Sequence, residues 1–278
     1  RFPGADNTYA CETMMSDGKA LQAGTSHFLG QNFARAFDIK FQNQNGDLEY
    51  AWTTSWGVST RLIGAIIMTH SDDDGLVLPP RVAPVKAAIL PIGTNEEKIN
   101  SALLPRAMEL SSELDRSLGG RCTVVDKQFY LRPGDRFFQH LQRGVPLRVE
   151  LGEKDMAAGT ARVVRRDSGE KLDIPLENLA SRVPVLLEDI QSGLFNRALD
   201  FRKKNTSVVS TYEEMKTVLE EKGGFIETWF AGSRDDEKKI KEETGATGRC
   251  MPIDSTEKGT CFYTGKPGAR KVIFAKAY

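Results

Sequence analysis

The sequence lacks a surplus of either charge. Its 278 residues contain 38 Lys and Arg against 38 Asp and Glu. No global electrostatic field therefore draws the chain toward a polyanion, and a nucleic-acid partner would have to be bound by a local basic face.

Cysteine is scarce as well, and the spacing of the cysteines does not suggest a metal site. The four cysteines, Cys11, Cys122, Cys250 and Cys261, are widely spread and form no Cys-x-x-Cys pair. This argues against both a disulfide framework and an obvious zinc site. No basic-then-apolar leader is present, and no apolar stretch reaches the roughly 20 residues that span a bilayer. We therefore expect a soluble protein of a reducing, cytoplasmic setting, without membrane association.

The pattern along the chain predicts a multidomain protein of mixed α/β and α+β class. A chain of this length can hold two or three domains. Residues 1–83 are strand-rich with one late helix, as at the end of an antiparallel sheet. Residues 84–190 alternate strands with helices, which implies a compact α/β domain with a partly parallel sheet. Residues 191–278 form a third, smaller α/β segment.

Local signals place the elements of the first segment. Ser16-Asp17-Gly18 predicts the turn of a hairpin, and residues 28–39 predict a short amphipathic helix. Residues 48–54 predict a strand. The apolar run of residues 62–68 predicts a buried helix with Arg61 in its first turn.

Further elements follow from the periodicity of the rest of the chain. Strands are predicted at residues 86–92, 122–126, 147–151, 160–166, 224–230, 249–253 and 272–276. Helices are predicted at residues 95–118, 133–142, 176–205, 211–222 and 234–244.

Arg61 is unusual where it stands, because a cation in the first turn opposes the helix dipole, which favours anions there. One interpretation is a core helix with an ordinary flanking arginine. The other is that a bound phosphate lies between the arginine and the helix.

Two ordered blocks resemble a known family. Ser55-Trp56-Gly57, Ser59-Thr60-Arg61 and Gly64, ending in GLVLPPRVAP, resemble motif 3 of the prolyl-tRNA synthetases, which are class II aminoacyl-tRNA synthetases. QAGTSHFLGQNFARAFDIKF, residues 22–41, resembles the strand and loop before that motif. The resemblance continues through RVELGEKD and EETGATGRC to the terminal VIFAKAY, so it covers the whole chain.

The resemblance implies roles for the residues of both blocks. Arg61 is the catalytic cation that contacts ATP, and an arginine suits bidentate phosphate contacts. Gln22 and Thr25 hold the ribose and phosphates of ATP or the adenosine end of tRNA. The floor and wall of the proline pocket are formed by His27, Ser55, Trp56, Gly57 and Ser59. Without the family, Trp56 reads as a core residue and His27 as a satisfied buried histidine.

Residues 84–190 resemble the anticodon-binding module of the same family. Arg148 and Lys154 match residues that read the guanines of the proline anticodon, and both types can contact guanine O6 and N7. The family's glutamate is replaced by Leu141, so either Gln139 or Gln142 substitutes for it or the contact is lost. The alternative interpretation of Arg148 is a charge at a strand edge.

The last segment resembles a C-terminal module that in many members binds zinc with four cysteines. Three of those positions are Ala231, Asp236 and Thr264, and only Cys261 remains. One thiolate and one carboxylate fall short of a closed tetrahedral site, so we expect no zinc.

The resemblance implies the C-terminal portion of an enzyme that attaches proline to its tRNA through prolyl-adenylate. ATP would be the substrate, Mg²⁺ would accompany it, and the parent would be a homodimer. Motifs 1 and 2 are not in the sequence, which opens on Arg1 without a methionine. We therefore expect a piece of a longer protein that does not activate proline alone. The alternative is a non-catalytic tRNA-binding or regulatory protein built from synthetase domains.

Overall fold

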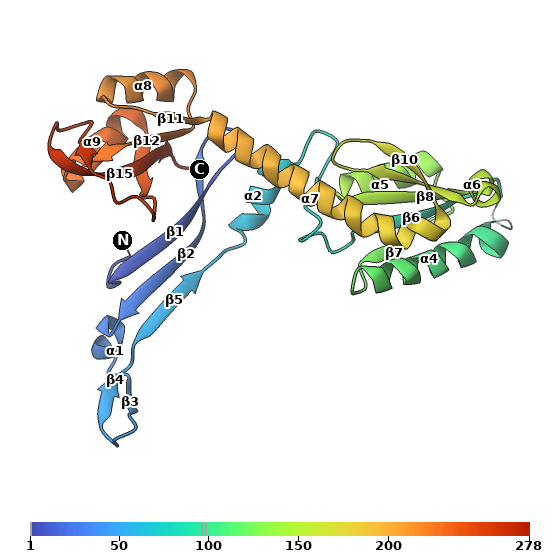
Figure 1. Cartoon of the computed structure of the whole chain (residues 1–278), viewed down its shortest axis with the longest axis horizontal. Coiled ribbons are helices and arrows are strands. Elements are labelled where there is room, and N and C mark those ends of the chain that lie inside the picture. Colours follow the sequence, from blue (N-terminus) through green and yellow to red (C-terminus); the bar gives the residue numbers. More distant parts are fainter. Residues whose placement is uncertain (1, 96, 98) are drawn as a thin grey trace. The chain divides into compact units, whose positions relative to one another are not determined.

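The computed structural model describes residues 2–95, 97 and 99–278, which group into two compact units (Figure 1). The first unit comprises residues 1–69 and 200–278, and the second comprises residues 70–199. Arg1 and two positions of the helix predicted at residues 95–118 lie outside the described residues. The predicted mixed α/β class is confirmed, whereas the division at residues 83 and 190 stays a prediction.

The first unit begins with an antiparallel sheet in the order β1-β2-β5. Its strands are β1 (Asn7–Met14), β2 (Ala20–Gly30) and β5 (Thr53–Gly57). The predicted hairpin turn is confirmed, because β1 and β2 pair antiparallel across it. Gly18 takes a φ of 78° there, a left-handed conformation that favours glycine.

Two predictions for this segment are wrong in extent. Residues 28–30 belong to β2, because Phe28 pairs with Asn7 of β1, so helix α1 is only Asn32–Ala36. The single strand predicted at residues 48–54 is two strands. The first of them, β4 (Leu48–Tyr50), pairs with β3 (Lys40–Gln42) in a separate hairpin.

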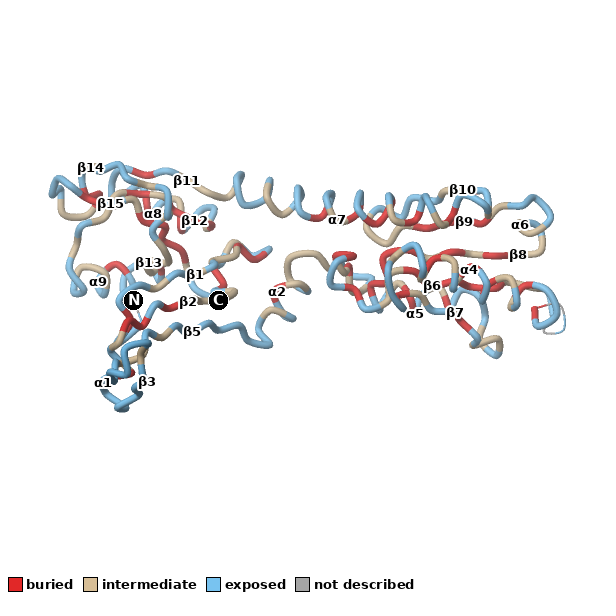
Figure 2. The backbone as a smooth tube through the Cα atoms, turned by 60° about the horizontal axis from the view of Figure 1, so that its bottom comes forward, coloured by how far each residue is buried: buried red, intermediate tan, exposed pale blue. Residues whose placement is uncertain are grey.

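The helix predicted at residues 62–68 is confirmed as α2 (Arg61–His70), but its predicted burial is wrong. Most of this helix is exposed or half-buried (Figure 2). Of its side chains only Ala65 is buried, and Ile63 is 63% exposed. Ala65 and Met68 pack on Met15 of the first sheet's hairpin. A narrow apolar stripe is therefore enough to pack this helix against the first sheet.

The terminal part of the first unit has its own sheet, in the order β11-β12-β15-β13. Its strands are β11 (Thr206–Val208), β12 (Phe225–Phe230), β13 (Ala246–Cys250) and β15 (Pro267–Lys276), with β14 (Gly259–Thr260) beside β15. Helices α8 (Tyr212–Glu221) and α9 (Arg234–Thr244) confirm the predictions, and capping boxes at Thr211 and Ser233 begin them. Strand β11 was not predicted from the sequence.

The two sheets of the first unit share a small core. Met14 and Ala20 of the N-terminal sheet pack with Phe225, Ile273 and Ala275 of the terminal sheet. The last residue is tied down as well, because Tyr278 N donates to the Ala20 carbonyl at 2.9 Å.

The second unit is built on one five-stranded sheet, in the order β10-β9-β8-β6-β7. Its strands are β6 (Ala87–Ile92), β7 (Thr123–Val125), β8 (Leu147–Gly152), β9 (Thr160–Arg165) and β10 (Lys171–Pro175). β6 is parallel to β7 and β8, whereas β9 is antiparallel to both of its neighbours, β8 and β10. The partly parallel sheet is therefore confirmed, although sequence analysis missed β10.

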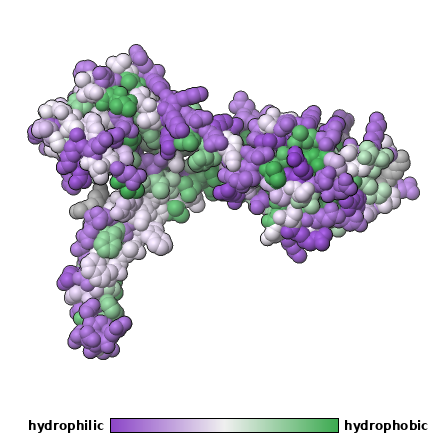
Figure 3. All heavy atoms as spheres, in the orientation of Figure 1, coloured by the Kyte–Doolittle hydropathy of each residue, from purple (hydrophilic) through white to green (hydrophobic). Residues whose placement is uncertain are grey.

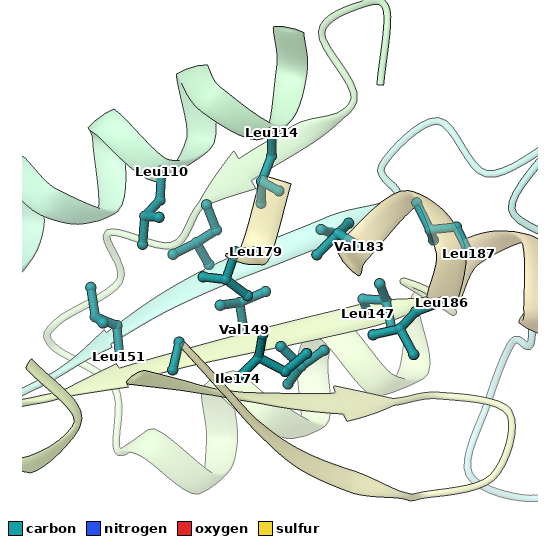
Figure 4. Close-up of a cluster of buried hydrophobic side chains, with 14 of the residues drawn as sticks. Leu110, Leu114, Leu147, Val149, Leu151, Ile174, Leu179, Val183, Leu186 and Leu187 are labelled. Carbon is teal, nitrogen blue, oxygen red and sulfur yellow. The ribbon is translucent and has the colours of Figure 1, made fainter. Parts of the chain in front are cut away.

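Helices cover both faces of this sheet. Leucines of α4 (Leu104–Ser117) and α7 (Leu179–Lys204) meet the inward side chains of β8 (Figure 4). A one-turn π-helix, η1 (Ile99–Leu103), precedes α4, and a 3-10 turn, η2 (Leu176–Asn178), precedes α7. On the other face, Phe137 of α5 (Pro133–Gln142) packs on Ala88 and Leu90. Sequence analysis missed the short helix α6 (Glu153–Ala158).

None of the helices described in residues 2–95, 97 and 99–278 has the length and apolar character needed to cross a bilayer.

Candidate functional site

A β-bulge brings three of the predicted site residues to one face of the first sheet. Ala10 pairs with Thr25 and Glu12 with Gln22, so β2 has one extra residue between these pairs. Side chains alternate along a strand, and without the bulge Gln22 and Thr25 would face opposite sides. With it, Gln22, Thr25 and His27 share a face.

These three residues line a cavity of about 920 Å³ in the first unit. This volume lies within the range of small-molecule sites. The opposite wall comes from the terminal sheet and α9, through Phe230, Glu237, Arg249, Met251, Arg270 and Phe274. The terminal segment therefore contributes half of the cavity that the predicted ATP and proline residues line.

His27 is buried and has a hydrogen-bond partner. Its side chain is 9% exposed, and Nδ1 lies 3.1 Å from the Thr8 hydroxyl. The Phe2 ring lies 4.6 Å from the His27 ring, centroid to centroid. The histidine is therefore both a satisfied buried residue and part of the cavity lining.

Strand pairing sorts the other predicted proline-pocket residues by face. Ser55 pairs with His27 and Gly57 with Thr25, so both lie on the cavity side of the sheet. Trp56 lies on the opposite side and is 80% exposed, which excludes the core interpretation. The structure does not bring Trp56 together with His27, and the roles of all of these residues stay predictions.

Several other large apolar side chains of this part of the chain are exposed, as Trp56 is. They include Phe28 and Trp52, whose rings stack at 5.9 Å, and Val58. Figure 3 shows patches of hydrophobic surface along this sheet.

Ser59 follows β5, and Arg61 is the first residue of helix α2. The Ser59 carbonyl accepts from Leu62 N at 3.1 Å, which closes the first turn. Arg61 is exposed and makes no ion pair or side-chain hydrogen bond within the described part of the chain. The charge of Arg61 opposes the helix dipole, and no described side chain neutralises it.

Arg148 is held in place on the second unit's sheet. Its Nε and Nη2 donate to Glu150 Oε1 at 2.9 and 2.8 Å, and its guanidinium lies 4.4 Å from the Phe137 ring centroid. Both charged side chains are 15% exposed. Because β8 lies between β9 and β6, the interpretation of Arg148 as a strand-edge charge is wrong.

The other predicted anticodon contacts are dispersed around Arg148. Lys154 is exposed in the first turn of α6. Leu141 and Arg148 together line a second cavity, of about 420 Å³. Gln139, which could replace the family's glutamate, instead accepts from Gln128 Nε2 at 3.0 Å. The carboxylate adjacent to Arg148 is Glu150, which sequence analysis did not single out.

The four positions that the resemblance compares with zinc ligands have other partners or carry no ligand atom. Cys261 Sγ accepts from Ala231 N at 3.3 Å and from Thr264 N at 3.4 Å. Burial raises the pKa of this thiol, but hydrogen bonds from the Thr264 side chain and from the backbone of Thr264, Ala231 and Tyr263 outweigh it and leave the pKa below the ordinary value. Asp236 accepts from Ser233 N and Oγ as the cap of α9. Among the described residues, no three His, Cys, Asp or Glu side chains gather as metal ligands.

We expect purified protein to contain well under one zinc per molecule, because the donor set is too small for a structural site. Elemental analysis measures the content. A chelator should leave the melting temperature unchanged, since no folding energy would come from metal. Stoichiometric zinc would show that Asp236 and Cys261 assemble a site with other donors.

Family models match two parts of the chain. The model described as "Anticodon binding domain" matches residues 86–186, and the model described as "Prolyl-tRNA synthetase, C-terminal" matches residues 212–278.

Individual relatives match the chain over its whole length. Curated proline–tRNA ligases of Cytophaga hutchinsonii and Flavobacterium johnsoniae are 49% and 50% identical to it, and the matched region is 56% of each relative. A solved structure, the prolyl-tRNA synthetase of Giardia lamblia in complex with prolyl-adenylate, matches with a TM-score of 0.89 and 31% identity. That match covers 100% of this chain and 59% of the solved one.

Proposed function

The chain belongs to the prolyl-tRNA synthetase family, and on that premise we propose that it is the C-terminal portion of a proline–tRNA ligase. The enzyme joins proline to its tRNA with ATP by way of prolyl-adenylate. The observation that carries the proposal is the 49–50% identity to curated proline–tRNA ligases along the entire chain. The chain spans a little over half the length of those relatives, 56–58%.

Gln22, Thr25 and Arg61 are the nucleotide-binding residues of this proposal. The proline carboxylate attacks the α-phosphorus of ATP, and negative charge passes to the pyrophosphate leaving group. An arginine stabilises such charge best where it is preorganised and free of internal partners. Arg61 meets the second condition, and Gln22 and Thr25 line one cavity. ATP would enter with Mg²⁺ bound to its phosphates.

The proline pocket of this proposal consists of one buried residue and several exposed ones. His27 contributes a fixed polar group to the cavity wall, and the Phe2 ring beside it supplies apolar surface. Ser55 and Gly57 of β5 extend the same face of the sheet, whereas Trp56 of the same strand lies on the opposite face and Ser59 follows the strand. A small apolar ring is bound by such a combination of apolar surface and a few polar groups.

The second unit is the tRNA-binding part of the proposal, with Arg148 and Lys154 as the guanine contacts. Glu150 and Phe137 fix the Arg148 guanidinium, so little side-chain entropy is lost when a base binds. We place the enzyme in the cytoplasm as a homodimer, in line with the family.

The direct test is proline-dependent ATP–pyrophosphate exchange. The full-length protein should catalyse exchange and charge proline tRNA, whereas the 278-residue chain should do neither, because it spans only 56–58% of the length of its curated relatives. A full-length protein that binds tRNA but catalyses no exchange would instead support the non-catalytic binding or regulatory protein.

Replacing Arg148 with alanine should reduce the preference for proline tRNA over an anticodon-swapped transcript by about 1–3 kcal/mol, since one base contact is lost. Non-specific affinity should change little. Titrating both transcripts at fixed salt measures the preference. Arg106→Ala is the matched control, because Arg106 is also ion-paired, to Glu109 and Glu113 of α4. Equal affinity of the unmodified chain for both transcripts would contradict the anticodon assignment.

A further inference from the structure

Glu12 is a buried carboxylate held by a residue from the far end of the chain. Its side chain is 3% exposed, and Arg249 of β13 donates to Oε2 from Nε at 3.0 Å and from Nη2 at 2.8 Å. A lone carboxylate is costly to bury, so this two-donor contact fixes both partners. Arg249 also lines the 920 Å³ cavity.

The other oxygen of Glu12 contacts Gln22. Gln22 Nε2 donates to Glu12 Oε1 at 3.5 Å, and the two residues are paired across β1 and β2. In this contact the nitrogen end of the Gln22 amide faces the Glu12 carboxylate oxygen. The carbonyl oxygen of that amide is then the end left for a ligand.

We propose that Arg249 is a positioning residue for the nucleotide site. Through Glu12 it orients the Gln22 amide, whose carbonyl oxygen accepts a hydrogen bond from a ribose hydroxyl of an adenosine nucleotide. The inference rests on the proposed function. It assigns to the terminal domain an indirect part in substrate binding, through three residues whose connection was not predicted from the sequence.

The test uses the full-length protein with Arg249→Ala, Gln22→Ala and the double variant. Arg249→Ala should raise the KM for ATP in pyrophosphate exchange about tenfold, with kcat nearly unchanged, because a binding contact is lost. Arg249→Lys keeps the charge and should recover part of the effect. In the Gln22→Ala background, Arg249→Ala should raise the KM no further, since both substitutions disable the same contact.

Exchange contains no tRNA, so a parallel aminoacylation assay separates the two sources of adenosine. A raised KM for tRNA alone would keep the inference and assign the contact to the terminal adenosine of tRNA. Lys271→Ala is the matched control: Lys271 pairs with Glu227 at 2.8 Å on the same sheet and lies outside the cavity lining. It should leave both KM values unchanged.

The inference would be overturned if folded Arg249→Ala protein had unaltered KM values. It would also be overturned if Arg249→Ala raised the KM as much in the Gln22→Ala background as it does in the wild type. If Arg249→Ala does not fold, the same cycle is run with Arg249→Lys and decides in the same way. A wild-type protein inactive in both assays would instead refute the proposed function, and this inference with it.

Discussion

Replacing Arg61 with alanine in the full-length protein is expected to reduce proline-dependent ATP–pyrophosphate exchange by about 10²-fold or more. Loss of a cation that stabilises charge on a leaving group has an effect of this size. The structure supports the role because Arg61 begins helix α2, is exposed and has no internal ion pair among the described residues. Exchange measured at saturating ATP separates the loss in kcat from weaker binding.

The matched control is Arg234→Ala. Arg234 is also an exposed arginine at the first position of a helix, α9, and it does not line the cavity. Exchange by this variant should equal that of the unmodified protein. Near-normal exchange by Arg61→Ala would mean that Arg61 is an ordinary surface charge of the helix without a catalytic role.

Elements with strong local signals were predictable from sequence. The bounds of α5 and α9 match the prediction, because Pro133 occupies the first position of α5 and Ser233 caps α9 through Asp236. Buried strands such as β6 were found from their continuous apolar runs. The short elements α6 and β10 were missed, because a few residues in a charged stretch carry little periodicity.

Features set by pairing across the chain could not be predicted in this way. The bulge that turns Gln22 toward Thr25 is visible only in the β1–β2 register. The contact between Arg249 and Glu12 joins residues 237 positions apart. Burial of the α2 helix was overestimated for a related reason, because an apolar run does not reveal what packs on it.

The candidate site depended on family resemblance, and the structure then grouped its members. Gln22, Thr25 and His27 share one cavity, whereas Trp56 lies on the other side of the sheet. Spacing alone could not have separated these residues, since strand faces are assigned only once the register is known.

The second large effect is expected in the buried ionic cluster beneath α5. Asp126 has 0% side-chain exposure and accepts from Arg136 Nε at 3.0 Å, lies 2.7 Å from His140 Nε2 and accepts from Gln128 N at 2.8 Å. Arg136 is 3% exposed and also donates to the Pro91 carbonyl. Arg136→Met keeps most of the volume but leaves the carboxylate underpaired, which should cost about 3–5 kcal/mol.

Hydrogen exchange of the β6 and β8 amides measures this loss, because it reports the opening free energy of their sheet. The matched control is Arg162→Met, which removes another arginine–aspartate pair of the same unit. Arg162 and Asp173 are 47% and 57% exposed, so the loss should stay below about 1 kcal/mol. Equal losses in the two variants would mean that burial does not set the strength of the Asp126 cluster.

The cluster also predicts a pH dependence. Burial raises the pKa of Asp126, but the Gln128 N–H, His140 and Arg136 outweigh it and hold the pKa below its ordinary value of 3.8. A lowered folded-state pKa adds stability above the ordinary value, and this stability is lost as the pH falls through the folded-state pKa. The difference between wild type and Arg136→Met should therefore be full at neutral pH and shrink below about pH 3.8. A difference that persists undiminished at lower pH would assign the loss to packing of the arginine rather than to its charge.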